Sequence, residues 1–132
     1  MHHPKIEDLV RRDQRYPPEA YEFVFNALKH TQELLGRAPG EEAKEDEHHV
    51  TGQDLLRGIR DLALREFGRM ARTVFRLWGI ERTDDFGEIV FNLIEGGMMS
   101  KTNEDDRSDF RGIYDLDRAL VEGFQFQLDE AR

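Results

Sequence analysis

The most concentrated chemistry in this sequence is a series of arginines in the middle of the chain. Steps of four, three and four residues, the spacing of one helix face, separate Arg65, Arg69, Arg72 and Arg76. They would form one continuous basic stripe if the break at Gly68 were mild. Guanidinium groups in such a row can bind an acidic protein, a phosphate ligand or RNA. The alternative is pairing with acidic side chains of the same or a second chain, which is common and weakly stabilising.

Two histidines beside three acidic residues are the next candidate, because imidazoles and carboxylates bind transition metals. His48 and His49 follow the run Glu45–Glu47. Adjacent histidines on an extended segment point to opposite faces, however, and no helical histidine spacing supports them. The acidic turn Asn103–Asp109 lacks the glycine and the final glutamate of a calcium-binding EF-hand loop. We therefore predict no metal and no cofactor.

No segment carries a catalytic motif. The sequence has no glycine-rich phosphate loop and no nucleophile elbow. The absence of cysteine excludes thiol nucleophiles and thiolate zinc sites. Four polar-tipped aromatics could line a pocket, although core or rim positions explain them more simply: Tyr16, Tyr21, Trp78 and Tyr114. We therefore predict no catalytic residue.

Charge is distributed unevenly along the chain. The net charge of -9 divides into -4 over residues 1–50, +3 over residues 51–82 and -8 over residues 83–132. An acidic protein is a poor general ligand for nucleic acid, so this balance disfavours such a partner. No apolar run is long enough to cross a bilayer, and the sequence begins without the apolar core of a signal peptide. We expect a single cytoplasmic domain over residues 1–132.

Helical periodicity organises most of this domain. We expect helices over residues 4–13, 18–35, 51–67, 70–78 and 83–95, the third capped by Thr51 and the last by Thr83. Asp115 can cap a final helix that carries Leu116 and Leu120. A solvated acidic loop over residues 37–47 and a frayed tail over residues 126–132 complete the domain.

Short extended segments predict a small antiparallel sheet of two or three strands beside these helices. Val50 belongs to the first strand, and residues 98–102 and 110–114 form a hairpin around the acidic turn. The fold class is thus mainly α with a small sheet, winged-helix-like in outline, with Phe86–Glu95 in the place of the recognition helix. The side predicted to be exposed would repel DNA, because it presents Asp84, Asp85, Glu88, Asn92 and Glu95.

The two halves of the chain contain similar short segments. Glu22–Asn26 matches Glu88–Asn92, and Leu55–Ile59 matches Leu120–Phe124, at offsets of 66 and 65 residues. These matches predict that a helix–loop–strand–helix unit occurs twice in the chain, with the two copies packed about a pseudo-twofold axis. The alternative is that short apolar words recur by chance at helical spacing.

Several stretches carry a likeness that goes beyond periodicity: Arg15–Val24, His49–Leu56, Trp78–Ile80, Thr83–Asn92 and Ser100–Thr102. Together they resemble a bacterial conserved-hypothetical family of unknown function, of the Plancto/Verruco type, from about Ile6 to Phe124. The resemblance implies a bacterial, cytosolic protein. It carries over no catalytic residue, because that family has no assigned activity.

We predict a non-enzymatic interaction or regulatory module. It would bind a protein partner, or a second copy of itself as a homodimer, through the basic stripe of Arg65, Arg69, Arg72 and Arg76 and through its acidic surfaces. One alternative is a nucleic-acid or phosphate-ligand binding module that uses the same arginines. A second alternative is an enzyme with an unrecognised site. No membrane partner is expected.

Overall fold

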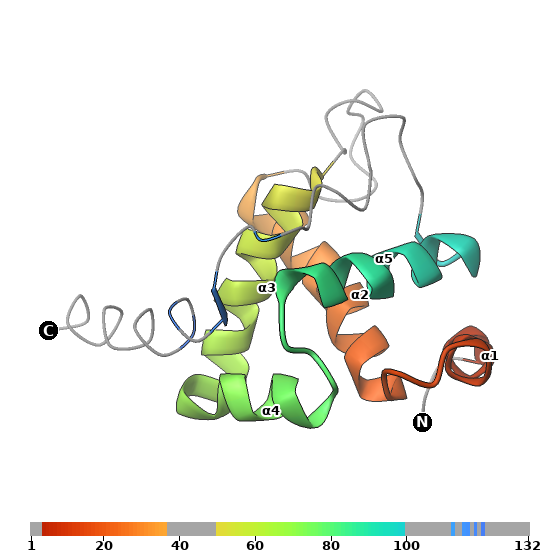
Figure 1. Cartoon of the computed structure of the whole chain (residues 1–132). Coiled ribbons are helices and arrows are strands. Elements are labelled where there is room, and N and C mark those ends of the chain that lie inside the picture. The colour runs from red at the N-terminus through yellow and green to blue at the C-terminus, as the bar shows by residue number, and fades with distance from the viewer. Residues whose placement is uncertain are drawn as a thin grey trace, which may run out of the picture.

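A computed structural model of the protein shows a helical architecture in the part of the chain that it describes (Figure 1). The described residues are 4–36, 50–99 and the positions 112, 115, 116, 118 and 120. In chain order the elements are α1 (Pro4–Arg12), α2 (Pro18–Leu34), α3 (Gly52–Phe67), the short 3-10 helix η2 (Gly68–Met70), α4 (Ala71–Leu77) and α5 (Thr83–Glu95). The predicted helices within these residues are therefore present.

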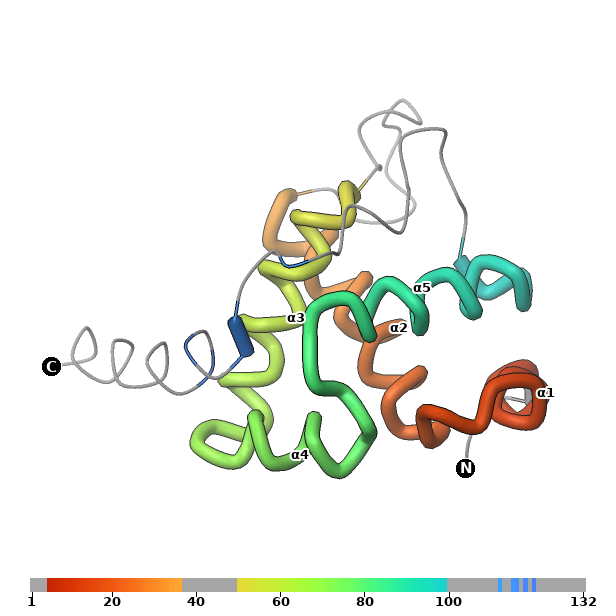
Figure 2. Tube along the Cα trace, viewed as in Figure 1, coloured from red at the N-terminus to blue at the C-terminus, as the bar shows by residue number. Residues whose placement is uncertain are grey.

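Helices α2 and α3 pack against each other at the centre, and α5 crosses them (Figures 1 and 2). Helix α1 contacts α2 and α5, whereas α4 follows α3 at the lower edge of the view. Each of the five α-helices contributes apolar side chains to one buried cluster, which includes Ile6, Leu9, Val24, Leu56, Ile59, Phe75, Phe86, Ile89 and Leu93.

Helix α2 begins and ends as its sequence predicts. Pro18 occupies the first turn, where a missing N–H leaves no helical hydrogen bond unmade. At the other end, the Gly36 N–H donates to the Glu33 carbonyl at 3.0 Å. Leu35 is 41% exposed because it lies beyond the last full turn as the C-cap residue.

The contact between α2 and α3 depends on a glycine. Thr51 caps α3 through the predicted capping box, in which its hydroxyl accepts from the Asp54 N–H at 3.0 Å. Two turns further on, Gly58 packs directly against Thr31 of α2, and both residues are buried. The Thr31 hydroxyl donates to the Ala27 carbonyl of its own helix at 2.6 Å, so the close contact contains no unpaired polar group.

The chain turns sharply between α3 and α4. Gly68 has a φ of 52° and a ψ of -125°, values outside the helical region, and η2 separates the two helices. An aromatic cluster fills the inside of this turn, with ring centroids 5.5 to 6.0 Å apart among Phe23, Phe67, Phe75 and Trp78. Helix α4 then ends in a Schellman motif, because the Ile80 N–H donates to the Phe75 carbonyl at 2.8 Å.

Helix α5 is capped differently from our prediction. Thr83, predicted as its cap, is instead the first helical residue and is fully buried. Asp85 reaches back from the first turn, where its Oδ2 accepts from the Glu81 N–H at 2.8 Å and from the Arg82 N–H at 3.1 Å. A carboxylate at this end of a helix also interacts favourably with the helix dipole.

Residues from the C-terminal part of the chain join the same core. Leu116 and Leu120 are buried in the apolar cluster, as predicted for a last helix. Asp115 accepts from the Arg118 N–H at 3.1 Å, which is the predicted cap. The Gly112 N–H donates to Asp84 at 3.0 Å and so connects this segment to the start of α5.

The predicted sheet and the winged-helix outline are wrong. Among the described residues there is no strand: Val50 is irregular, and Met98 and Met99 lie in a bend after α5. The backbone N–H groups of Met98 and Met99 both donate to the Leu93 carbonyl, so they continue the helix end and do not start a hairpin. The predicted repeat of a helix–loop–strand–helix unit required such a strand and fails with it. The predicted acidic loop 37–47 and tail 126–132 lie outside the described residues.

Within the described ranges, no helix combines the length and apolar character needed to cross a bilayer.

The close approach of α2 and α3 gives a first prediction. A methyl group added at Gly58 would overlap the Thr31 hydroxyl oxygen and lie 2.9 Å from the Thr31 Cβ. We expect Gly58→Ala to lower the free energy of unfolding by about 3 kcal/mol in urea titrations followed by Trp78 fluorescence. The same change in a Thr31→Ala background should cost less, because the overlapping hydroxyl is gone. A cost below about 1 kcal/mol for the single variant would show that the helices can separate easily.

Candidate functional site

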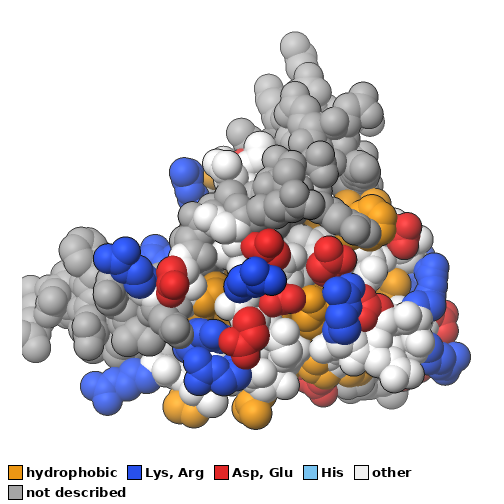
Figure 3. All heavy atoms as spheres, in the orientation of Figure 1, with side chains coloured by type: hydrophobic (Ala, Val, Ile, Leu, Met, Phe, Trp, Pro, Cys, Tyr) orange, Lys and Arg blue, Asp and Glu red, His pale blue; other side chains and the backbone are white. Residues whose placement is uncertain are grey.

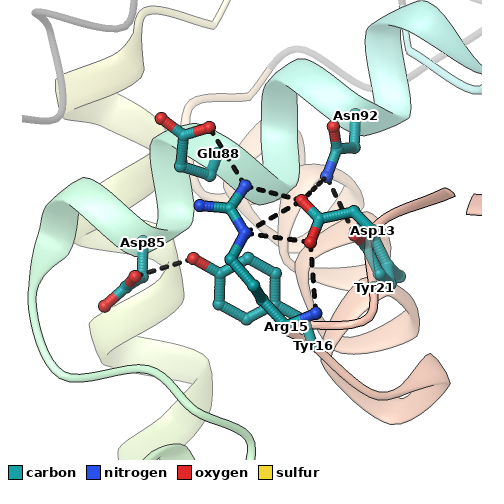
Figure 4. A network of polar contacts seen from close by, with 7 residues as sticks. All are labelled: Asp13, Arg15, Tyr16, Tyr21, Asp85, Glu88 and Asn92. Atoms are coloured by element: carbon teal, nitrogen blue, oxygen red, sulfur yellow. Dashed lines mark hydrogen bonds and ion pairs between the residues drawn. The ribbon is translucent and has the colours of Figure 1, made fainter. Parts of the chain in front are cut away.

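A network of polar side chains joins the corner between α1 and α2 to one face of α5 (Figure 4). Its members are Asp13, Arg15, Tyr16, Tyr21, Asp85, Glu88 and Asn92. The corner forms because Asp13 follows the last turn of α1 and accepts from the Arg15 N–H at 3.1 Å, as an Asx turn does. This local bond places the Arg15 and Tyr16 side chains toward α5.

The Asp13–Arg15 ion pair is the centre of the network. The Arg15 Nε lies 2.9 Å from Asp13 Oδ1, and its Nη2 lies 2.6 Å from Asp13 Oδ2. The amide of Asn92 on α5 donates to the same Asp13 oxygen at 2.9 Å, and Arg15 also pairs with Glu88 at 3.4 Å. The bonds from Arg15, followed by the bond from Asn92, hold the pKa of Asp13 well below its usual range despite partial burial.

Two buried tyrosines also bind α5, Tyr16 from the corner and Tyr21 from α2. The Tyr16 hydroxyl donates to Asp85 Oδ1 at 2.7 Å, so Asp85 binds the corner with one oxygen while its other oxygen caps α5. The Tyr21 hydroxyl accepts from Asn92 at 2.9 Å. Burial raises the pKa of both phenols, and for Tyr16 the hydrogen bond to the Asp85 carboxylate raises it further.

These shifts determine what the network can do chemically. A general acid or base needs a pKa near the working pH. Asp13 remains ionised and Tyr16 and Tyr21 remain protonated at neutral pH, because each pKa moves away from neutrality. Among the described residues, every buried side-chain nitrogen and oxygen has a hydrogen-bond partner. We interpret the network as a structural clamp that holds α5 against the α1–α2 corner.

A hollow of about 270 Å³ lies beside the clamp. It is lined by Leu9, Arg12, Asp13, Arg15, Asn92 and Glu95. Most of the polar groups in this lining already serve the clamp, because Asp13, Arg15 and Asn92 are bonded to one another. The hollow therefore offers a ligand few uncommitted groups.

The clamp also corrects our view of α5. We predicted that Asp85, Glu88 and Asn92 would form an exposed acidic face, but all three are part-buried and bonded to the corner. These side chains follow one another at steps of three and four residues, and all three reach the corner. The periodicity that assigned them to one face was correct, but the sequence did not show that a charged turn would cover that face. The one available signal was the polar corner before Pro17.

The predicted arginine stripe is divided by the turn at Gly68. Arg65 remains on α3 and pairs with Asp61 at 2.8 Å, and Asp61 also contacts His30 of α2 at 2.7 Å. Arg69 lies in η2, whereas Arg72 and Arg76 lie on α4. The four side chains therefore do not follow one helix, as the stripe required.

Arg72 has a different position from the other three arginines. It is 8% exposed and faces the core side of α4. Its Nη1 donates to the Ile80 carbonyl at 3.1 Å, and its Nη2 pairs with Glu81 at 2.9 Å. Arg72 thus links α4 to the segment that leads into α5. The predicted partner-binding role of Arg65, Arg69 and Arg76, which are all exposed, stays a prediction.

The side of α4 that faces away from the core carries exposed apolar residues. Met70, the last residue of η2, is 56% exposed, and Leu77, the last residue of α4, is 78% exposed. They are seven residues apart and so lie on the same face, and Arg69 and Arg76 each precede one of them. Figure 3 shows hydrophobic side chains protruding beside Lys and Arg side chains at the lower edge, where Figure 1 places α4. We call Arg69, Met70, Thr73, Arg76 and Leu77 the α4 outer face.

The other candidate sites are not placed by the structure. His48, His49, Glu45–Glu47 and Asn103–Asp109 lie outside the described residues, as does Tyr114. In the described ranges, no three or more histidine, aspartate or glutamate side chains gather in a way that could hold a metal ion.

Comparisons with known proteins found no matching family model, curated protein or solved structure.

The clamp predicts a pH dependence of stability. The folded-state pKa of Asp13 is lowered, so its stabilisation is present above the unfolded-state pKa near 4 and is lost as the pH falls from about 5. We expect Asp13→Asn to cost about 1.5 kcal/mol at pH 7 and to flatten the decline in stability between about pH 5 and pH 3. Asp8→Asn is the control, because its exposed pair with Arg11 at 3.5 Å should contribute less than about 0.5 kcal/mol. Parallel pH profiles for the wild type and Asp13→Asn would contradict the clamp.

The position of Arg72 gives a third prediction. Arg72→Met keeps the volume but leaves the Ile80 carbonyl without this donor, so we expect it to lower the free energy of unfolding by about 2 kcal/mol. Arg69→Met changes an exposed arginine and should alter stability by less than about 0.5 kcal/mol. Thermal and urea unfolding measure both. Equal effects of the two changes would mean that Arg72 is not a structural link.

Proposed function

We propose that the protein is a non-enzymatic interaction module that binds another protein through the α4 outer face. The observation that carries this proposal is the exposure of Met70 and Leu77, 56% and 78%, at the last residue of η2 and the last residue of α4. Each is preceded by an exposed arginine, Arg69 and Arg76 respectively. Single exposed apolar residues are ordinary on protein surfaces, but apolar side chains that share a face with arginine are typical of protein interfaces.

The composition of this face favours protein over nucleic acid, the alternative that uses the arginines. Nucleic-acid binding depends on several cations that neutralise successive phosphates. Of the four predicted arginines, Arg72 is buried, and Arg65 lies on α3, on the other side of the turn at Gly68. Two large apolar side chains on the remaining surface contribute nothing to phosphate contacts, and the net charge of -9 opposes a polyanion.

Charge also argues against symmetric self-association through this face. A twofold contact between two copies of α4 would bring the Arg69 and Arg76 side chains of one copy near those of the other. Like charges at an interface cost free energy, so an acidic partner is favoured over a second α4. A homodimer could still form through an acidic surface elsewhere on the chain, which is a separate arrangement. The absence of cysteine from the sequence supports the proposed cytoplasmic location, and the proposed bacterial family remains a resemblance.

Capture from the native host with matched variants tests this function. Met70→Ser combined with Leu77→Ser removes the apolar part of the α4 outer face without touching the core. Leu34→Ser combined with Leu35→Ser is the control, because these leucines are also exposed, 52% and 41%, but lie at the end of α2. We expect a partner identified by mass spectrometry to be lost with the first variant, by tenfold or more, and kept with the second.

Two results would contradict the proposed function. In the first, the wild type and both variants capture the same proteins in the same amounts. In the second, nuclease treatment removes the captured material, which would favour the nucleic-acid alternative. Size-exclusion chromatography of all three proteins checks that the changes leave the fold and the oligomeric state unaltered.

A further inference from the structure

We infer that the partner segment is an amphipathic α-helix with acidic residues beside its apolar seam, which packs along α4 in the manner of a coiled coil. This inference rests on the proposed function and specifies the chemistry of the partner. It follows from the positions that the exposed and buried residues of α4 occupy in a seven-residue repeat.

The repeat is defined by exposed residues of η2 and α4, which follow each other directly in the chain. Met70 and Leu77 occupy successive a positions, and Thr73, also exposed, occupies the d position between them. The positions that should face away from a partner are b, c and f, which hold Ala71, Arg72 and Phe75. All three of these residues are buried against the rest of the domain. The outward side of α4 therefore has the register of one coiled-coil strand.

The spacing along the helix sets the length of the partner contact. Met70 and Leu77 are seven residues apart, which corresponds to about 10 Å along the axis at 1.5 Å per residue. A partner helix that runs alongside would contact Met70 and Leu77 with apolar residues at its own a and d positions, over two to three turns. An extended peptide has no comparable way to bind, because strand addition needs unpaired backbone groups and those of a helix are already bonded.

The arginines select the charge of that helix. Arg69 and Arg76 both occupy g positions, next to the a residues, and both are exposed. Residues at g contact the flanking positions of the neighbouring helix, where opposite charges set the choice of partner. Glutamate or aspartate at these flanking positions matches α4, whereas lysine or arginine is repelled. A second copy of α4 is excluded by the same rule, because it carries arginine at both positions.

A designed helical peptide is the probe. It has three heptads with leucine at a and d and glutamate at e and g, and repulsion between its glutamates keeps it from pairing with itself. The first comparison peptide has the same composition in scrambled order, so it carries equal charge but no seam. The second has lysine in place of each glutamate. Fluorescence anisotropy with the full chain should show at least tenfold tighter binding of the acidic helix than of either comparison peptide.

Variants of the full chain assign the binding to α4. We expect Met70→Ser combined with Leu77→Ser to weaken binding of the acidic helix at least tenfold. Arg69→Glu combined with Arg76→Glu should reverse the preference, so that the lysine helix binds more tightly than the glutamate helix. Leu34→Ser combined with Leu35→Ser should leave binding within about twofold of the wild type. Circular dichroism of each variant confirms that the helices are retained.

Each other outcome overturns the inference. Equal binding of the acidic helix and its scrambled form would mean that charge alone is recognised. Unchanged binding by the serine variant would place the contact elsewhere. A dimer of the wild type that is lost in the serine variant would make a second copy the occupant. If the designed helix fails but capture still depends on Met70 and Leu77, the helix inference is wrong and the proposed function stands; if both fail, both are wrong.

Discussion

The close approach of α2 and α3 is the constraint on which the rest of the structure depends. Because Gly58 has no side chain, α3 comes close to α2 at Thr31. Helix α5 then packs against both of these helices. Phe23 of α2 then reaches the aromatic rings of Phe67, Phe75 and Trp78, which fill the turn between α3 and α4. A wider separation of α2 and α3 would loosen both the aromatic cluster and the packing of α5, because both depend on contacts with these two helices.

The clamp around Asp13 and Asp85 also holds α5 in place, on the side of α5 that faces the corner between α1 and α2. One side of α5 packs against the apolar core, and an adjacent side carries polar groups of the clamp. The buried polar atoms among the described residues all have hydrogen-bond partners within the molecule. Asp85 and Glu88 thus hold the helix against the corner. The surface on which we base the proposed function lies instead on η2 and on α4, the shortest α-helix among the described elements, where Met70 and Leu77 are exposed.

Local sequence rules predicted the helices well, since caps and stop signals are properties of neighbouring residues. Thr51 with Asp54, Gly36 and Asp115 all occur as expected. The errors concern contacts between distant residues. Nothing near Arg72 indicates that it turns inward to Ile80, eight positions later in the chain, and nothing near Glu88 indicates that Arg15 covers it. The sheet was predicted from composition alone, and the bend at Met98 shows that a helix-end motif can mimic the start of a strand.

The inward position of Arg72 has a consequence for binding kinetics. A helix of seven residues does not form by itself in water, because the cost of its first turn is not recovered over so short a length. Arg72, Phe75 and the motif at Ile80 hold α4 in its helical form before any partner arrives. The chain therefore loses little conformational entropy when this face is occupied, and such preorganisation favours fast association without a folding step.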